Sequence, residues 1–521
     1  MRHDVLIVGA GPTGLVLALW LTRMGVNVRI ISKASGPGTA SRALAIHART
    51  LELYGQMGLA EAIVADGHHV AGVNVWVGGE KQARMPLGAI GENLTPYPFL
   101  HIYPQDRHEK LLLSRLESMG VSVEWNTSFI GFEEKSDGII ARLLAGDGTE
   151  SVCEASFLAG CDGAGSAVRK SLGLGFAGGT YQQTFYVADI EASGPPMNGE
   201  LNIALDSADF LAVFPLDQGS RARLVGTVEE NDTEAGTLRF EDLNDKAVAH
   251  LGIEVTAVNW FSTYRVHHRV AEHFRKGRAF ILGDAAHIHS PAGGQGMNTG
   301  IGDAINLAWK LKMALGNSLK DEPAVDRLLS SFEEERITFA RKLVRTTDQA
   351  FSLATSDGRI AQFVRTRIVP LVMPLAVELE RVREFMFRTV SQIMINYRGD
   401  YLSFGEAGEI HGGDRLPWID LTDGRSNYDT LAGMCWHIHV YGYAGYALED
   451  WCAAREIPLH VFPWDAAFGE AGLARDAAYL LRPDSYVAAA FARPSPEAIE
   501  SYFDARGIGM SEAAKTDAYS A

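Results

Sequence analysis

Cysteine is scarce in this chain. Among 521 residues there are four, Cys153, Cys161, Cys435 and Cys452, and no two of them form a C-x-x-C pair. This scarcity excludes a disulfide framework and a dithiol redox centre, and it is typical of a protein kept in a reducing compartment. We therefore expect a cytoplasmic protein.

Positive charge is also in deficit. The chain has 47 lysines and arginines against 64 acidic residues, for a formal net charge of -17. The basic residues are scattered rather than clustered, so the sequence predicts no nucleic-acid partner and no anionic membrane surface.

Long apolar runs are few, and the most prominent one is interrupted. Residues 5–21, VLIVGAGPTGLVLALWL, contain three glycines and a proline and have little basic flank. A buried strand, a turn and a helix explain this run better than a signal peptide or a membrane span. With 47% hydrophobic and 21% charged residues, the composition predicts a globular protein of two or three domains.

A glycine fingerprint follows the first apolar strand. Gly9, Gly11 and Gly14 have the G-x-G-x-x-G spacing, with a helical pattern to about Met24 and a second strand, VNVRII, behind it. In such a β-α-β unit the first glycine makes the turn, the second admits a pyrophosphate and the third lets the helix pack on the strand. The helix N-terminus favours phosphate. We predict a dinucleotide site here.

The acidic residue expected at the end of the second strand is missing, because Ser32 and Lys33 occupy that place. Two interpretations remain open. A hydroxyl can replace the carboxylate against an adenosine ribose, or a small residue with a cation can accept the 2′-phosphate of NADP.

The rest of the chain suggests further divisions. Residues 184–265 are rich in strand patterns, and VSVEW at 121–125 also predicts a strand. A buried strand ending at Asp284 precedes the glycine-rich stretch GDAAHIHSPAGGQGMNTG at 283–300. A helix with Ile301, Ile305, Ala308 and Trp309 on one face follows it. After about residue 405 the pattern becomes that of a small α/β domain, and residues 508–521 predict a disordered tail.

Several polar residues have ordinary structural interpretations. His287 and His289 are spaced like a metal pair, but no cysteine or acidic cluster accompanies them, so we predict no metal site. Asp303 is expected to pack within its helix. Arg49 and Glu52 are expected to form a surface ion pair.

Three motifs in this order resemble the class A flavoprotein monooxygenases, the family of para-hydroxybenzoate and phenol hydroxylases. They are GAGPTG at 9–14, CDGAGSAVR at 161–169 and GDAAHIHSPAGGQGMNTGIGDAINLAWKL at 283–311. The C-terminal GDRLPWIDLTDGRSNYDTL resembles the thioredoxin-like appendage of the phenol hydroxylase branch, here without redox cysteines, which implies a structural or homodimer-contact role.

The resemblance implies an α/β fold with three parts. A Rossmann-like FAD-binding domain would comprise residues 1–72, 98–183 and 266–395. A β-rich substrate domain inserted into it would comprise 73–97 and 184–265, and a thioredoxin-like domain 405–507.

The resemblance also implies an FAD site. The ADP part would lie on Gly9, Gly11, Pro12, Thr13 and Gly14, with Ser32 or Lys33 near the ribose. Arg42 would neutralise the pyrophosphate, Gln105 would reach the ribityl chain, the Phe129 backbone would meet adenine, and Asp284 would hold a ribityl hydroxyl. Asp162 would belong to a motif that serves both FAD and the pyridine nucleotide.

For the flavin ring, the glycine-rich stretch supplies backbone rather than side chains. The N–H groups around Gly294, Gly296, Met297 and Asn298 would stabilise the anionic reduced flavin, and Pro291 would line the dry space beside C4a. The implied reaction uses NADPH or NADH and O2. It delivers a hydroxyl group from a flavin C4a-hydroperoxide to a phenolic or polycyclic aromatic substrate.

The substrate site is less well defined by the sequence. Leu44 stands where phenol hydroxylases carry an aspartate, so the base that activates the phenol has to be sought elsewhere. The candidate catalytic residues are His47, Tyr264 and Arg269, and the candidate substrate contacts are Tyr186 and Phe214. Alternatives from the same sequence are Baeyer–Villiger oxygenation on the same fold, an NADP-dependent dehydrogenase and a non-catalytic flavin sensor. A halogenase is disfavoured because its lysine and tryptophan motif is not found.

Overall fold

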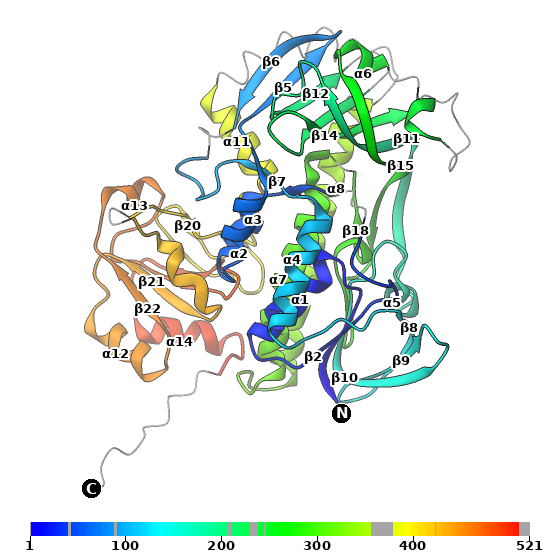
Figure 1. The fold of residues 1–521 in the computed structure, drawn as a ribbon. Coiled ribbons are helices and arrows are strands. Elements are labelled where there is room, and N and C mark those ends of the chain that lie inside the picture. Colours follow the sequence, from blue (N-terminus) through cyan, green and yellow to red (C-terminus); the bar gives the residue numbers. More distant parts are fainter. Residues whose placement is uncertain are drawn as a thin grey trace. The chain divides into compact units, whose positions relative to one another are not determined.

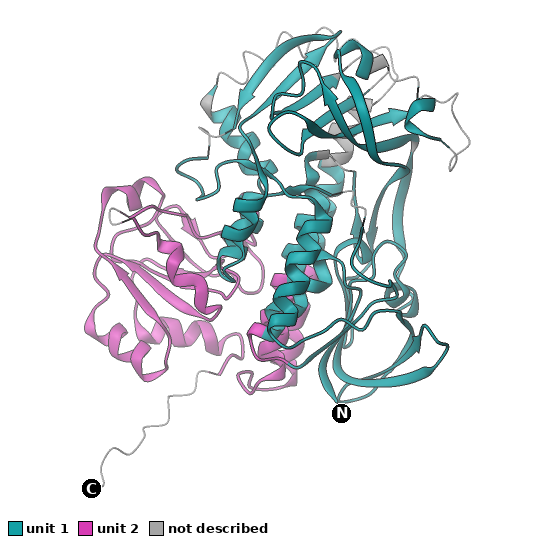
Figure 2. Cartoon of the chain, in the orientation of Figure 1, with its two compact units in different colours: residues 1–22, 27–304, 337–393 teal, residues 23–26, 305–336, 394–521 magenta. Residues whose placement is uncertain are grey.

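The computed structural model describes residues 2–39, 43–87, 91–205, 210–228, 238–243, 246–290, 292–355, 379–421 and 424–509. The chain forms two compact units (Figure 2). Unit 1 comprises Met1–Thr22, Asn27–Ala304 and Ile337–Ile393, and unit 2 comprises Arg23–Val26, Ile305–Arg336 and Met394–Ala521. The division into three domains predicted from the sequence stays a prediction.

The core of unit 1 is a parallel sheet in the order β17-β10-β1-β2. These strands are β1 (His3–Val8), β2 (Val28–Ile31), β10 (Glu150–Gly160) and β17 (Ala279–Ile281), and β8 (Thr127–Glu134), β9 (Ile139–Ala145) and β16 (Arg275–Lys276) extend the sheet in antiparallel fashion. Parallel strands end at the same edge of a sheet, and ligands of such folds bind at that edge. The residues that follow the four strands, Gly9, Ser32, Cys161 and Leu282, are therefore neighbours.

The first helix confirms the predicted β-α-β unit. Helix α1 (Pro12–Arg23) starts directly after the fingerprint, and its residues from Gly14 to Leu21 are buried. Helix α4 (Gln105–Ser118) begins at Gln105, and α5 (Ala167–Ser171) follows the second motif. The strand predicted at VSVEW is wrong. Only Glu124 pairs there, in an isolated bridge to Ile31. Apolar and polar residues alternate in this stretch, but within it only Val123 is buried.

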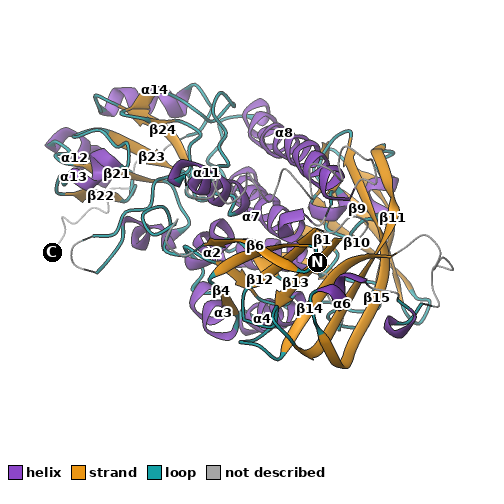
Figure 3. Cartoon of the chain, turned by 90° about the horizontal axis from the view of Figure 1, so that it is seen from above, coloured by secondary structure: helices purple, strands orange, loops and turns teal. Residues whose placement is uncertain are grey.

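A second sheet of unit 1 has eight strands in the order β18-β15-β11-β14-β13-β12-β5-β6. Their bounds are β5 (Gly72–Val77), β6 (Glu80–Pro86), β11 (Phe176–Ser193), β12 (Leu201–Leu205), β13 (Phe210–Pro215), β14 (Arg221–Val228), β15 (Glu254–Ala271) and β18 (His287–Ile288). The two long strands β11 and β15 run side by side (Figure 3). The strand-rich region thus extends past the predicted limits of 184 and 265 at both ends.

A small three-stranded sheet and several helices complete unit 1. The sheet has the order β3-β7-β4, from β3 (Ala45–Ile46), β7 (Leu100–Ile102) and β4 (His68–Val70). The helices are α2 (Ala48–Gly55), α3 (Ala60–Asp66), α6 (Lys246–His250), α11 (Glu380–Val390) and parts of α7 (Gln295–Leu315) and α8 (Glu322–Thr355), as labelled in Figure 1.

Unit 2 holds the C-terminal α/β region. Its sheet has the order β22-β21-β23-β24, from β21 (His437–Tyr441), β22 (Leu459–Phe462), β23 (Ala478–Leu481) and β24 (Val487–Phe491). Strands β21 and β22 are parallel and the others antiparallel. Helices α12 (Tyr446–Ala454), α13 (Ala466–Glu470) and α14 (Pro496–Asp504) alternate with these strands.

Buried charges cross-link unit 2. The Arg482 guanidinium donates to both carboxylate oxygens of Glu335, at 2.8 and 3.0 Å, and Lys310 Nζ lies 2.9 Å from the same carboxylate. Arg482 also pairs with Asp484 at 2.6 Å. Because these side chains are almost completely buried, removing one partner would leave an uncompensated buried charge.

All four cysteines are free thiols. In the described part of the chain, no helix is long and apolar enough to cross a membrane.

Candidate active site

The glycine fingerprint forms a turn that only glycine can make. Gly9 has φ +107°, and a Cβ on it would lie 2.2 Å from the carbonyl oxygen of Cys161. A Cβ on Gly14 would lie 2.0 Å from the carbonyl oxygen of Gly9. A Cβ on Gly11, in contrast, would meet no atom within 4 Å, so the backbone there is open beside the N-terminus of α1. This arrangement fits a pyrophosphate.

The first and third motifs meet at Thr13. A Cβ on Gly300 would lie 2.4 Å from Thr13 Oγ1, and a Cβ on Gly283 would lie 2.6 Å from it. Helix α1 and the start of α7 therefore approach each other through glycines. This close approach joins the two halves of the proposed dinucleotide site.

Asp303 packs within the fold, as expected, but it does more than pack in its own helix. Its Oδ2 accepts hydrogen bonds from the Gly283 backbone N–H at 3.0 Å and from His287 Nε2 at 2.7 Å. Asp303 and His287 are buried. The pair holds the turn in which Asp284 lies, and Asp284 itself is exposed.

The stretch predicted to cradle the flavin ring opens a long helix. Gly293 and Gly294 have φ of +73° and +63°, and α7 begins at the next residue, so Gly296, Met297 and Asn298 lie in its first turn. The first N–H groups of a helix have no partner inside it and carry partial positive charge. We define the flavin cradle as residues 293–298.

The Asn298 side chain fastens the cradle to the segment around β3. Its Oδ1 accepts from the His47 N–H at 2.9 Å and from Thr50 Oγ1 at 2.8 Å. Its Nδ2 donates to the carbonyl oxygens of Ala45 at 2.9 Å and Gly294 at 3.0 Å. The sequence predicted a backbone role for Asn298, and this side-chain role was missed.

Unpartnered polar atoms surround the cradle. In the described part of the chain, the Ser290 hydroxyl, His289 Nε2 and both ring nitrogens of His47 are buried without a normal hydrogen bond. The carbonyl oxygens of Gly293 and Val390 nevertheless lie near enough to the His47 ring to favour its protonated form. Buried polar atoms are normally satisfied, so this cluster fits a polar ligand such as a flavin.

Burial keeps these histidines neutral. It lowers the pKa of His47 to about 4 and that of His289 to about 4. Because an unfolded histidine titrates near 6.5, the unfolded state binds more protons between pH 6.5 and 4. Stability contributed by the neutral rings is therefore present above pH 6.5 and is lost as the pH falls through this window.

We expect His47→Gln to flatten the acid loss of stability. Melting temperatures of the flavin-free protein, measured from pH 7 to pH 4, should fall less steeply in the variant than in the wild type. The exposed His250→Gln serves as the control and should keep the wild-type slope. An unchanged slope in His47→Gln would show that this ring is not held neutral by the fold.

The remaining predicted FAD residues lie along the same edge of the parallel sheet or beside it. Ser32 is buried and its Oγ accepts from the Ala34 N–H at 3.3 Å, whereas Lys33 is exposed. Gln105 starts α4 and donates to Glu109 at 2.7 Å. Glu109 in turn accepts from the Gly38 N–H at 2.9 Å.

Phe129 and Asp162 have structural partners. Phe129 is buried in β8, whose first residue, Thr127, donates its N–H to the Ser32 carbonyl. The Asp162 carboxylate accepts from the N–H groups of Ala167 at 2.6 Å and Val168 at 3.2 Å, so it caps α5. The predicted cofactor contacts of both residues stay predictions. Arg42 and Pro291, like residues 510–521 of the predicted tail, lie outside the described residues.

The candidate substrate residues separate onto the two faces of the eight-stranded sheet. Strand pairing sets Phe185 opposite Tyr264 and Phe214 opposite Arg223, and Tyr264 and Phe214 pack in one cluster. Tyr186 points to the other face, because side chains alternate along a strand. There it is fully buried against Phe240 and Phe261. We therefore withdraw Tyr186 as a substrate contact.

Arg269 lies on β15 beside β18, the short strand that precedes the cradle. Its backbone pairs with Ile288 of β18, the residue before His289. The Arg269 Nε is buried without a hydrogen bond among the described residues. The structure thus brings Arg269 and His47 to the two flanks of the same motif.

The Arg49 and Glu52 pair is not on the surface, so that expectation was wrong. The two side chains lie 3.1 Å apart with exposures of 4% and 1%, and Glu52 also accepts from Thr95 Oγ1 at 2.6 Å. Every residue from Ala48 to Tyr54 in α2 is buried. The helix is therefore covered on all sides, and this explains why the ion pair lies inside the protein. No cluster of three metal-binding side chains occurs among the described residues.

Comparison with known proteins gives the same assignment. The family model described as an FAD binding domain matches residues 2–347. The chain is 35% identical over 413 residues to 6-methylpretetramide 4-monooxygenase of Streptomyces rimosus, covering 78% of this chain and 71% of the relative. It is 30% identical over 432 residues to pentachlorophenol 4-monooxygenase of Sphingobium chlorophenolicum, covering 80% and 76%.

A solved structure agrees along the whole chain. The anhydrotetracycline hydroxylase OxyS of Streptomyces rimosus superposes with a TM-score of 0.77 at 28% identity, covering 98% of this chain and 100% of that one. The family match spans more than half of the chain. The chain therefore belongs to the FAD-binding monooxygenases and is an FAD-dependent aromatic monooxygenase, as its three motifs predicted.

Proposed function

We propose that this enzyme hydroxylates a flat phenolic compound of several fused rings. It would bind this compound on the face of the eight-stranded sheet that carries Phe214 and Tyr264. The observation that carries the proposal is a group of four partly exposed aromatic side chains over a floor of small residues, which we call the aromatic platform. The aromatic side chains are Phe210, Phe214, Trp260 and Tyr264, and the floor is Val187, Ala212 and Val225.

The strand register supports one common face for the platform. Val187 pairs with Val225, which pairs with Ala212, so the three form a row across the strands. The aromatic side chains flank this row two residues away along the strands, about 7 Å on either side. A contiguous partly exposed apolar surface marks a binding site, and aromatic rings stack well on flat ligands.

The platform lies near the flavin cradle. Phe214 also packs against the apolar cluster that contains Ala45, and a Cβ on Gly294 would lie 3.0 Å from the Ala45 Cβ. One apolar cluster thus connects the platform with the segment that packs on the cradle. This proximity fits a ring carbon held beside the reactive edge of a flavin.

When bound, FAD would accept a hydride from NADPH or NADH and activate O2 for transfer of one oxygen atom to the substrate. The N–H groups of Gly296, Met297 and Asn298 would then face the negative pyrimidine end of the reduced ring. Gly11 would receive the pyrophosphate, and Gly9, Pro12, Thr13 and Gly14 would shape its turn.

We propose different roles for Arg269 and His47, the two polar residues that flank the glycine-rich stretch at 283–300. Arg269 carries a fixed positive charge, and a nearby cation favours the ionised form of a phenol, which is the form that attacks an electrophilic oxygen. His47 is a weak base because burial lowers its pKa to about 4. It would therefore accept a hydrogen bond from the substrate hydroxyl and orient the substrate, rather than take the proton from that hydroxyl. Tyr264 would contact the substrate ring from the platform.

The other finer assignments follow from the same reasoning. The C-terminal sheet of unit 2 has a βαβ unit followed by an antiparallel hairpin and a helix, which supports a thioredoxin-like domain without redox cysteines. We propose a structural or homodimer-contact role for it and a cytoplasmic location for the enzyme.

We expect Phe214→Ala to raise the KM for the aromatic substrate about tenfold, since one aromatic contact is worth about 0.5–1.5 kcal/mol beyond its buried area, while FAD content is unchanged. Phe240→Ala is the matched control, because Phe240 packs on the opposite face.

The assay screens simple and polycyclic phenols for stimulated oxidation of NADPH or NADH, with product mass to detect one added oxygen. Equal effects of the two variants, or stimulation by simple phenols alone, would contradict the platform. A product with oxygen inserted next to a carbonyl would instead support Baeyer–Villiger oxygenation.

A further inference from the structure

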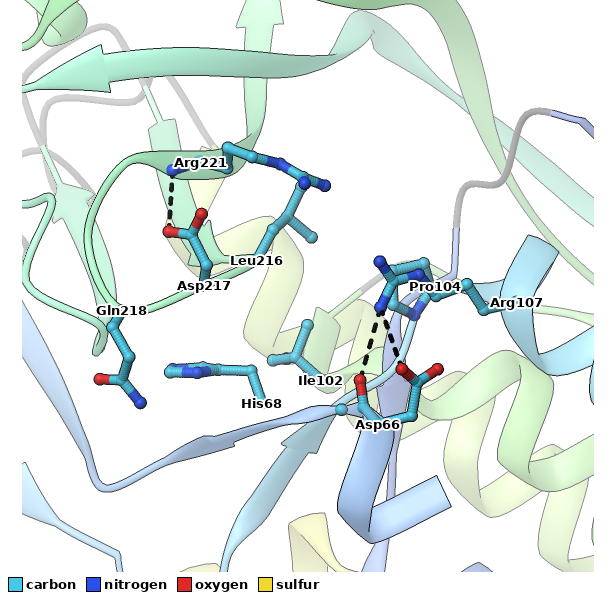
Figure 4. A pocket seen from close by; sticks show the side chains of 10 residues that line it. Asp66, His68, Ile102, Pro104, Arg107, Leu216, Asp217, Gln218 and Arg221 are labelled. Atoms are coloured by element: carbon cyan, nitrogen blue, oxygen red, sulfur yellow. Dashed lines mark hydrogen bonds and ion pairs between the residues drawn. The ribbon is translucent and has the colours of Figure 1, made fainter. Parts of the chain in front are cut away.

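A cavity of about 270 Å³ lies in unit 1 at the end of the eight-stranded sheet. Its walls come from the end of α3 and the start of β4, from the β7–α4 connection and from the turn between β13 and β14 (Figure 4). None of the residues predicted to bind FAD or substrate lines it. Its lining side chains include Ile102, Leu216, His68, Arg107 and Arg221.

The cavity lies at the end of the sheet face that carries the aromatic platform. Side chains two residues apart on a strand share a face, so Leu216 follows Phe214 of the platform, and Arg221 precedes Arg223 in the same way. Leu216 and Ile102 also belong to the apolar cluster that contains Ala45. A ligand lying on the platform could therefore extend into the cavity.

The two arginines that line the cavity differ in whether they have an acidic partner. Arg107 is paired with Asp66, by a hydrogen bond of 3.4 Å to its carbonyl oxygen and at 3.7 Å to its carboxylate. Among the described residues, the Arg221 guanidinium has no hydrogen bond or ion pair. Figure 4 shows that Arg107 comes from α4 and Arg221 from the sheet, so the two cations reach the cavity from different walls.

Asp217 does not supply the missing partner. Its Oδ1 accepts from the N–H groups of Gly219 at 3.0 Å, Ser220 at 2.8 Å and Arg221 at 2.9 Å, and its Oδ2 accepts from the Ser220 hydroxyl at 2.8 Å. Burial raises the pKa of Asp217, but these bonds outweigh it and lower the pKa to about 2. The Asp217 carboxylate thus bonds to groups of its own turn rather than to the Arg221 guanidinium.

We propose that this cavity binds an anionic group, a carboxylate or a phosphate, between Arg107 and Arg221. This inference rests on the proposed function, because the anion would belong to a molecule used in the reaction. Two sources share this chemistry: the acidic end of an extended aromatic substrate, and the 2′-phosphate of NADPH. Paired guanidinium groups bind either oxyanion through charge-assisted hydrogen bonds.

The test uses the FAD-loaded enzyme, whose visible flavin absorbance reports independently that the cofactor site is intact. Its affinities for 9-anthracenecarboxylate and for 2′-phospho-ADP-ribose are measured by titration calorimetry. The counterparts are 9-anthracenemethanol, which lacks the carboxylate, and ADP-ribose, which keeps the diphosphate and lacks only the 2′-phosphate. Arg221→Gln and Arg107→Gln are compared with Lys81→Gln, which removes a positive charge from β6 at a residue that does not line the cavity.

We expect one of the two anionic probes to lose at least tenfold in affinity in Arg221→Gln and in Arg107→Gln, with its counterpart and Lys81→Gln unchanged. Loss for the carboxylate identifies the substrate as the source, and loss for 2′-phospho-ADP-ribose identifies the electron donor. If neither anion binds, or if both keep their affinity in the two variants while the flavin stays bound, the proposal is overturned. Colourless protein would instead count against the proposed function.

Discussion

Replacing Gly11 with aspartate is expected to abolish FAD binding while leaving the protein folded. A Cβ at this position meets no atom within 4 Å, and an acidic residue near the start of a helix is compatible with its dipole. The new carboxylate would occupy the space in which the pyrophosphate must approach. Like charges in contact cost several kcal/mol, so the affinity for FAD should fall about a thousandfold.

The control for this experiment is Ser136→Asp. Ser136 is exposed in the connection between β8 and β9, so this variant adds the same negative charge outside the three motifs. Fluorescence titration with FAD gives both affinities, and circular dichroism compares the folds. Near wild-type FAD affinity in Gly11→Asp would remove the pyrophosphate from this turn.

Replacing Asn298 with leucine should have the second large effect. The two side chains are similar in size, but leucine would leave four partners without these hydrogen bonds: the buried His47 N–H, Thr50 hydroxyl and Ala45 carbonyl oxygen, and the partly buried Gly294 carbonyl oxygen. At about 1 kcal/mol or more for each unsatisfied group, the free energy of unfolding of the flavin-free protein should fall by about 4 kcal/mol.

The same substitution should weaken FAD binding, because Asn298 fixes the first turn of α7 against the segment around β3. Denaturant unfolding with and without FAD separates the two effects, since a ligand stabilises the native state in proportion to its affinity. Asn259→Leu, at an exposed position of β15, should change neither quantity. A stable Asn298→Leu protein that binds FAD normally would contradict the role given to this side chain.

Local pattern predicted the parts of the fold in which neighbouring residues carry the information. The β-α-β unit follows from an apolar strand, a glycine spacing and a helical period, and the structure has β1, α1 and β2 there. The stretch VSVEW failed because alternation of apolar residues predicts a strand only when one face is covered. Here only Val123 is buried.

Tertiary pairing determined what the sequence could not reveal. Tyr186 and Phe214 are both aromatic residues in strands, and only the register of β11, β14 and β13 shows that they point to opposite faces. The spacing of Arg49 and Glu52 is the same for a surface pair and a buried pair, and the covering of α2 on all sides makes it a buried one.

The cradle combines both kinds of information. Its glycines were visible as a motif, since positive φ and close approach require them. The unpartnered His47, His289 and Ser290 were not, because they come together only when β3, β18 and α7 are assembled. An asparagine in the first turn after two glycines was the one available signal for the side-chain role of Asn298.

The most direct test of the whole account is the amount of FAD bound per chain after equilibration with the cofactor, measured from visible flavin absorbance and protein concentration. We expect one FAD per wild-type chain and none for Gly11→Asp at the same concentrations. Wild-type protein that stays colourless in the presence of excess FAD would contradict it.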